Sequence, residues 1–132
     1  MKVYRIAKTR YADDLSGIDA RMYGGRWNRK GTSILYTSEN RALATVVYLV
    51  HAPLSIVPAN LSLVTLQIPD NITPKEVQIS DLPSNWRAYP PPLKLAELGT
   101  NWAKMNQALL LRVPSAVVEG EFNILIIRFI RA

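Results

Sequence analysis

The stretch GGRWN, residues 24–28, combines residue types that suit the binding of an anionic ligand. Its two glycines, Gly24 and Gly25, would let the backbone approach a ligand closely. Arg26 can bind a phosphate through two parallel hydrogen bonds, and Trp27 can stack on a planar ring. The alternative interpretation is a glycine turn that carries an exposed arginine.

Two further stretches place a hydroxyl group near the end of a predicted strand. LYTSE, residues 35–39, puts Tyr36 just before a helix N-terminus, where backbone N–H groups favour anions. RVPSAVV, residues 112–118, sets Ser115 after a proline, where a simple serine-containing turn is the alternative. Neither stretch indicates a ligand site by itself.

The chain has no cysteine and a single histidine, His51. The lack of cysteine excludes disulfides, thiolate nucleophiles and most structural zinc sites. His51 follows the run VVYLV without a nucleophile-elbow sequence, so we expect it to support the structure or the site rather than to act as a catalytic base. The Asp and Glu residues show no metal-like spacing, and no metal is expected.

Length and charge narrow the class of protein. A chain of 132 residues suffices for one domain with a sizeable core, so residues 1–132 are expected to form a single domain. The formal net charge of +6 favours a nucleotide, a nucleic acid or an acidic protein as partner, but the basic residues are scattered. No run approaches the roughly 18 apolar residues of a membrane span, and no signal peptide is evident, so a cytoplasmic protein is expected.

The N-terminal half is predicted to position these residues on two strands and a helix. Residues 2–8 and 32–38 have strand composition, and the polar stretch between them, residues 11–31, is expected to be a functional loop with a short helical turn at 13–15. A helix is predicted over residues 39–51, with Ser38 as N-cap and Pro53 after its end. Its apolar stripe is Leu43, Val46, Val47 and Val50, which makes Val47 a core residue by pattern alone.

The C-terminal half is predicted to be mostly strands. A proline-bounded turn at 52–60 leads to strands at 61–69 and 75–80, and a Pro-Pro-Pro run forms a surface connection. A helix at 97–106 is weakened by Gly99 and Thr100, and strands follow at 108–114 and 122–130. The pattern predicts an α+β domain in which strands dominate.

Taken in order along the whole chain, the motifs resemble the RES domain family: YRI, DLSGIDA, GGRWN, LYTSE, ALATVVYLVH, LPSNWR, LGTNW, LLLRVPSAVV and EFNILI. The resemblance implies an ADP-ribosyltransferase-like fold, with a mixed, mainly antiparallel twisted sheet flanked by a few helices. It also implies a toxin of a bacterial toxin–antitoxin pair that cleaves the nicotinamide–ribose bond of NAD, by phosphorolysis with inorganic phosphate or by hydrolysis. The implied partner is an Xre-type helix-turn-helix antitoxin that covers the active site, with a homodimer possible within the complex and DNA contacted only through the antitoxin.

The family's functional residues can be carried over position by position. The resemblance implies that arginine would hold the pyrophosphate, that an aromatic ring would stack or orient the nicotinamide, and that serine and asparagine would bind sugar or phosphate oxygens. The family arginine, tyrosine and serine fall on Arg26, Tyr36 and Ser115, which are expected to be catalytic. Substrate-binding roles are expected for Arg5, Gly25, Trp27, Asn28 and Asn123.

The family glutamate should stand in the helix at ALAxxExLVH, and Val47 occupies that position. A carboxylate there would stabilise the cation-like ribose and fix its hydroxyls, and electrostatic groups of this kind often supply roughly 10² to 10³ in rate. Valine can do neither, so this copy is expected to be inactive or weakly active. Three explanations stay open: an introduced inactivating substitution, a natural loss of activity, or replacement by another acid such as Glu39, Glu119 or Glu121.

The chain departs from the family again at its end, where LIIRFIRA replaces the usual NP and histidine. The favoured function is an NAD-degrading toxin impaired at position 47. The alternative is a catalytically inactive binding module that acts with a DNA-binding antitoxin. ADP-ribosylation of a protein or nucleic acid and direct nucleic-acid binding rank below both.

Overall fold

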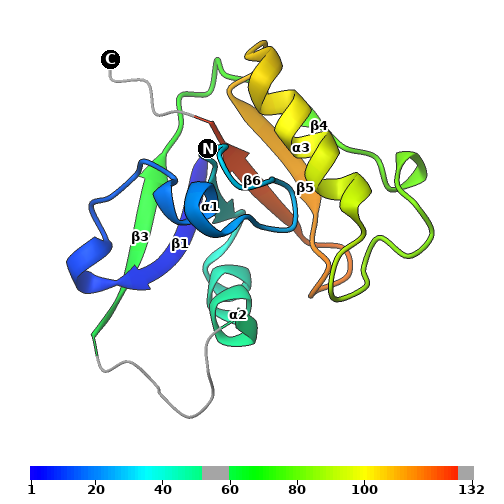
Figure 1. The fold of residues 1–132 in the computed structure, drawn as a ribbon. Helices are drawn as coiled ribbons and strands as arrows, with labels where there is room; N and C mark the ends of the chain where they lie inside the picture. The colour runs from blue at the N-terminus through cyan, green and yellow to red at the C-terminus, as the bar shows by residue number, and fades with distance from the viewer. Residues whose placement is uncertain (52–59, 128–132) are drawn as a thin grey trace.

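The computed structural model describes residues 1–51 and 60–127 (Figure 1). The predicted turn at 52–60 therefore falls almost wholly outside the described residues, as do the last residues of the predicted strand at 122–130. In the described part, no helix is long and apolar enough to cross a membrane.

The core of the molecule is a six-stranded sheet in the order β3-β1-β2-β6-β5-β4. Neighbouring strands are antiparallel except β4 and β5, which are parallel. This mixed, mainly antiparallel sheet confirms the α+β prediction. The strands are β1 (Lys2–Lys8), β2 (Leu35–Ser38), β3 (Leu61–Gln67), β4 (Lys75–Glu76), β5 (Leu110–Pro114) and β6 (Phe122–Ile126).

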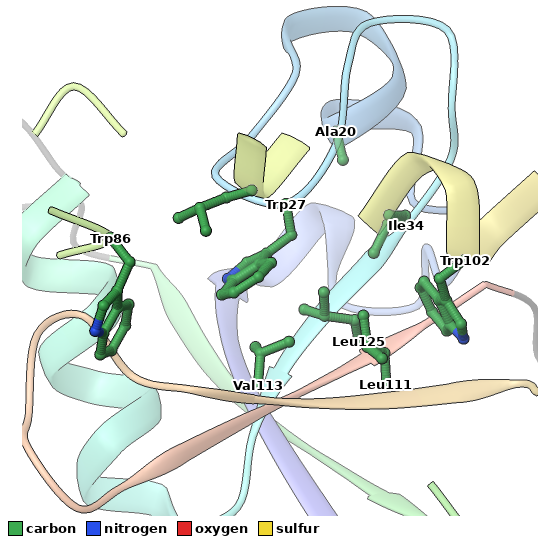
Figure 2. Close-up of a cluster of buried hydrophobic side chains, with 9 residues drawn as sticks. Ala20, Trp27, Ile34, Trp86, Trp102, Leu111, Val113 and Leu125 are labelled. Carbon is green, nitrogen blue, oxygen red and sulfur yellow. The ribbon is translucent and has the colours of Figure 1, made fainter. Parts of the chain in front are cut away.

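Side-chain alternation along β5 and β6 builds two core clusters, because successive residues of a strand point to opposite faces. Leu111, Val113 and Leu125 enter the first cluster, which packs under α3 (Leu93–Met105) and contains Trp27, Trp86 and Trp102 (Figure 2). The second cluster takes the alternate positions Leu110, Ile124 and Ile126, together with Val3, Leu35, Leu66 and Ile68.

The long polar stretch contains a helix that the sequence pattern did not locate. The helical turn predicted at 13–15 is wrong in position: a 3-10 turn covers Thr9–Tyr11, and α1 runs over Ile18–Tyr23. Gly17 starts α1 with a positive φ of 71°, and a Cβ there would lie 2.7 Å from the backbone of Ile34. Contact with a distant segment therefore sets where α1 begins.

Helix α2 (Arg41–His51) starts two residues later than predicted, with a different cap. The side-chain Oδ1 of Asn40 accepts a 2.8 Å hydrogen bond from the backbone N–H of Leu43, as an N-cap does. Ser38 is instead the last residue of β2, and its Oγ accepts a bond from Asn123. The cap prediction fails because pairing with β6 extends β2 through Ser38.

The predicted apolar stripe of α2 is only partly buried. Leu43 and Ala44 are buried, Val47 is half-buried, and Val50 is 58% exposed. The prediction of Val47 as a core residue is therefore corrected: α2 packs against β1 and β2, but its fully buried residues are Leu43 and Ala44.

Helix α3 begins four residues before the predicted start and includes both residues expected to weaken it. Gly99 and Thr100 are buried in the helix rather than placed near a frayed end. Strand predictions at 61–69, 108–114 and 32–38 are confirmed with shorter bounds. The one at 75–80 yields the two residues of β4 and a 3-10 turn, Ile79–Asp81.

The sheet is nearly divided at its centre. Strands β1 and β3 pair over seven positions, from Lys2↔Gln67 to Lys8↔Leu61, whereas β1 and β2 pair only at Tyr4↔Ser38. Beyond that pair the two strands separate, which leaves room between the β3-β1 half and the β2-β6-β5-β4 half.

Candidate active site

A cavity of about 670 Å³ opens where β1 and β2 separate. It is lined by residues of both strands, by α1 and the loop after it, by α2, and by the turn after β5. The structure thus brings to one place residues more than 100 positions apart in the sequence. All the nominated residues except Asn28 line it: Arg5, Gly25, Arg26, Trp27, Tyr36, Val47, Ser115 and Asn123.

Arg26 is a half-buried cation held by main-chain carbonyls. Its Nη1 donates to the oxygen of Trp86 at 2.8 Å and its Nη2 to that of Ala88 at 3.2 Å. Burial lowers the pKa of its guanidinium, but an arginine remains charged at neutral pH. No carboxylate of the described residues forms an ion pair with it, so its charge is available to an anionic ligand.

Arg5 supplies a second positive charge from β1. Its Nη1 donates to the carbonyl of Asp14 at 2.9 Å. Burial lowers the pKa of Arg5, and the nearby carboxylates of Asp14 and Asp19 act in the opposite direction. The cavity therefore receives one cationic group from β1 and another from the loop after α1.

Tyr36 and Asn28 hold the loop that carries Arg26. The Tyr36 hydroxyl accepts the backbone N–H of Trp27 at 3.0 Å and donates to Oδ1 of Asn28 at 2.7 Å. The Asn28 amide lies within hydrogen-bonding distance of the carbonyls of Ala20, Arg29 and Thr32. Asn28 is buried behind the cavity, so it shapes the site without lining it.

Gly25 is needed by this same network. A Cβ at position 25 would lie 2.7 Å from the Tyr36 hydroxyl and 2.9 Å from Oδ1 of Asn28. The glycine therefore admits the tyrosine to the loop, which is a different reason from the close ligand approach expected from the sequence.

The indole of Trp27 belongs to the hydrophobic core. It is 2% exposed and packs in the first cluster, as Figure 2 shows. In this arrangement its ring offers no open face for stacking, contrary to the interpretation of GGRWN. The exposed aromatic ring on the cavity is that of Tyr23, at 72% exposure, which the sequence reasoning missed although it directly precedes Gly24.

Ser115 and Asn123 each form hydrogen bonds within the protein and keep one further hydrogen-bonding group for a ligand. The Ser115 Oγ accepts the backbone N–H groups of Val117 and Val118 at 3.1 and 3.0 Å, so its O–H is left to donate. The Asn123 amide nitrogen donates to the carbonyl of Thr37 and to Oγ of Ser38, which leaves its carbonyl oxygen as an acceptor. The serine-containing turn considered as an alternative is thus present, and Ser115 also lines the cavity.

Val47 lines the cavity on α2 beside Ala44, Tyr48 and His51. His51 is exposed, and its Nδ1 lies 2.7 Å from the carbonyl oxygen of Val47, so the ring is bound to its own helix. This agrees with the supporting role expected for the only histidine.

The glutamates considered as replacements for the missing carboxylate do not line the cavity. Glu39 is bound by Arg112 through two hydrogen bonds of 2.9 and 3.2 Å, and Glu121 accepts a bond from Asn40. The acidic residues that do line the cavity are Asp14 and Asp19, which belong to the DLSGIDA motif and were missed as site residues. In residues 1–51 and 60–127, no group of three or more His, Asp or Glu side chains is arranged to hold a metal.

The fold and the site define a small α+β domain with a cleft at the centre of a divided sheet, lined by Arg5 and Arg26 and by Asp14 and Asp19. The RES domain family model matches residues 2–131, and the chain belongs to the RES domain family.

Several relatives resemble the chain over most of its length. A protein of Sphingobium sp. (strain YBL2) named Prs ADP-ribosylating toxin is 38% identical, over 91% of this chain and 76% of that protein. Proteins named Toxin Res are 38% identical in Yersinia enterocolitica, over 96% of this chain and 83% of the relative, and 32% identical in Photorhabdus laumondii, over 96% and 81%.

A solved structure has the same fold. The crystal structure of the M. tuberculosis MbcT–MbcA toxin–antitoxin complex contains a chain that matches with a TM-score of 0.73 and 20% identity. The match covers 95% of this chain and 72% of that chain. At this identity the likeness concerns the fold.

Proposed function

We propose that this protein is the toxin of a bacterial toxin–antitoxin pair, and that its cavity binds NAD for cleavage of the nicotinamide–ribose bond. The observation that carries the proposal is the convergence of the family positions Arg5, Arg26, Ser115 and Asn123 on one cavity, together with position 47. The names of the relatives support the toxin assignment, and one of them includes ADP-ribosylation, a reaction that uses NAD.

The side chains suit the parts of a dinucleotide. Arg26 and Arg5 would bind the pyrophosphate, because neither is neutralised by an ion pair among the described residues. The O–H of Ser115 would donate to a sugar or phosphate oxygen, and the carbonyl of Asn123 would accept from a ribose hydroxyl. In the reaction, the C–N bond breaks with its electron pair on nicotinamide, and the ribose carbon bonds to an oxygen of phosphate or water.

Val47 would impair this reaction in the chain as it stands. The departing nicotinamide leaves positive charge on the ribose, and a carboxylate at position 47 would stabilise that charge within the cavity. Asp14 and Asp19 also line the cavity, but they belong to the loop before α1 and to α1 itself, whereas the family glutamate is expected on α2. We therefore propose that NAD binding survives and turnover is low.

The proposed partner is an Xre-type helix-turn-helix antitoxin that covers the cavity, and the proposed assembly contains a homodimer of the toxin. Side chains at the cavity include the exposed Ile18, Tyr23 and Val117, which a protein partner would bury. The M. tuberculosis structure of related fold is itself a toxin–antitoxin complex. DNA contacts are assigned to the antitoxin, and a reaction on NAD would place the protein in the cytoplasm.

Two other functions have specific support. The valine at the family glutamate position favours an inactive binding module that acts only with its antitoxin. The name of the Sphingobium relative favours transfer of ADP-ribose to a protein. Both candidates use the same cavity, so the products formed from NAD distinguish the three functions. The inactive module forms no product, ADP-ribosyl transfer leaves ADP-ribose on a protein, and NAD degradation leaves free ADP-ribose or its phosphate.

The test is restoration of the carboxylate by Val47→Glu. We expect nicotinamide release from NAD to rise by on the order of 10² to 10³ over the parent chain, because the acid stabilises the cation-like ribose. Val47→Gln is the matched control: it is similar in size and polar but uncharged, and should stay near the parent rate. In cells without antitoxin, Val47→Glu should lower NAD and arrest growth.

The outcome distinguishes the candidates. A folded Val47→Glu protein that binds NAD without releasing nicotinamide, while the parent binds a helix-turn-helix partner tightly, would favour the inactive module. Radiolabel from NAD found on a protein, in place of free ADP-ribose or its phosphate, would favour ADP-ribosyl transfer.

A further inference from the structure

Two residues of α3 make an unusually close contact with the loop that carries Arg26. A Cβ at Gly99 would overlap the carbonyl oxygen of Trp27, and it would also lie 2.8 Å from the Trp27 carbonyl carbon. The helix can therefore approach this backbone only because position 99 has no side chain. Figure 2 shows Trp27 reaching down from this loop into the cluster that also receives Trp102 of α3.

Thr100 adds a hydrogen bond one residue further along the helix. Its Oγ1 accepts the backbone N–H of Arg29 at 2.9 Å, and the side chain is 5% exposed. Arg29 also binds α3 through its guanidinium, which lies 2.8 Å from Oε1 of Glu97. The loop after Arg26 is thus held at two points: Trp27 packs closely against Gly99 and donates its N–H to Tyr36, and Arg29 is bonded to Thr100 and Glu97 of α3.

Local propensity does not explain a Gly-Thr pair in the interior of a helix. Glycine and threonine are both poorer helix formers than alanine, so this pair disfavours α3 when the helix is considered alone. The contacts with the loop account for it, since they require the small residue at 99 and the hydroxyl at 100.

No residue of α3 lines the cavity. An effect of α3 on ligand binding must therefore pass through the loop. We propose that Gly99 and Thr100 are positioning residues for Arg26: they hold the loop against α3 so that the guanidinium is presented to the cavity. This inference depends on the proposed function in one respect, the identity of NAD as the ligand.

Binding measurements on the parent chain test this directly, because slow turnover allows an equilibrium titration with NAD. Thr100→Val keeps the shape but removes the acceptor for the Arg29 N–H, and we expect it to weaken NAD binding on the order of tenfold, as for coupled neighbours. Thr100→Ser keeps the hydroxyl and should bind within about twofold of the parent.

A double-mutant cycle separates positioning from general destabilisation. If Thr100 acts through Arg26, Thr100→Val should have little further effect in an Arg26→Ala background. Ile68→Val is the matched control, because Ile68 is buried in the second core cluster and does not line the cavity. It should lower the melting temperature without changing NAD affinity.

Additive effects of Thr100→Val and Arg26→Ala, or an equal loss of affinity in Ile68→Val, would overturn the inference. Titration with inorganic pyrophosphate makes the two proposals separable. If the parent binds pyrophosphate but not NAD, with positions 26 and 100 still coupled, the proposed function fails and the positioning role is supported. If it binds neither, both fail.

Discussion

The hydroxyl of Tyr36 lies between the backbone of Trp27 and the side chain of Asn28, with a hydrogen bond to each. The family resemblance predicts that this tyrosine acts on the ligand directly, yet its hydroxyl donates one hydrogen bond and accepts another within the protein. Arg26, by contrast, keeps a charge that no described carboxylate neutralises. At the scale of single residues, the nominated side chains thus divide into those that can reach a ligand and those that hold the loop.

Replacing Tyr36 by Phe should cost about 1 to 3 kcal/mol of unfolding free energy at neutral pH, since it leaves the Trp27 N–H and the side-chain Oδ1 of Asn28 without their Tyr36 partner. Urea unfolding measures the loss. Tyr23→Phe is the control, because its exposed ring has no hydrogen bond within the described residues. Equal stability of Tyr36→Phe and the parent would contradict the role of Tyr36 in holding the loop that carries Arg26.

Tyr36 also predicts a loss of stability in alkaline solution. Burial raises the pKa of its phenol above the ordinary value near 10, and the Trp27 hydrogen bond and the charge of Arg26 oppose this only in part. Above about pH 10 the unfolded chain loses a proton that the folded protein retains, so this contribution is complete below that pH and is lost as pH rises toward the folded pKa. The decline should be shallower in Tyr36→Phe. If the unfolding free energies of the two proteins fall in parallel as the pH rises, the raised pKa of Tyr36 does not cause the decline.

At the scale of elements, α2 shows how strand pairing and capping together position residue 47 at the cavity. Pairing with Asn123 keeps Ser38 in β2, and Asn40 then caps the helix through Leu43. The register of α2 that results places Val47 on the cavity and turns Val50 toward solvent. The helix start therefore decides that residue 47, at the proposed position of the family glutamate, lines the cavity.

Loss of the Asn40 cap should destabilise the protein by about 1 kcal/mol, the usual value for removing an N-cap side chain. Thermal unfolding of Asn40→Ala measures this, and Asn40→Ser, which can still cap, should recover most of the loss. If the two variants unfold at the same temperature, the cap contributes little. The bond from Asn40 to Glu121 would then be the interaction of interest.

At the scale of the whole molecule, the cavity lies in a sheet whose two central strands, β1 and β2, pair at one position only. Tyr4 and Ser38 join the halves, and the separation of β1 and β2 beyond them provides the space lined by Arg5 and Tyr36. A ligand in this space would contact both halves at once. Binding should therefore stiffen the connection between them.

Hydrogen exchange followed by NMR tests this arrangement. Amides of β1 that bond to β3 should exchange slowly, whereas those directed toward the gap beyond Tyr4 should exchange faster, because they lack a strand partner there. Saturating NAD should slow the second group. Uniform protection along β1, with or without NAD, would argue against a divided sheet.

The sequence alone predicted the class of fold and most of the strands, and its resemblance to the RES domain family proposed Arg26, Ser115 and position 47 as site positions. These follow from local patterns: alternation in strands, glycine and proline at turns, and short motifs in a characteristic order. Charge and the lack of cysteine likewise depend only on composition.

Only the tertiary structure decided where α1 begins, why Gly99 and Thr100 lie inside a helix, and that the indole of Trp27 is core. It also brought Asp14, Asp19 and Tyr23 to the cavity. Asp14 and Asp19 belong to the DLSGIDA motif, but their local sequence does not show that they face a cavity. The physical reason is that these properties depend on contacts between distant segments, such as Gly17 with Ile34 and Gly99 with Trp27. Local periodicity predicts which face of an element is apolar, but not which distant backbone packs against it.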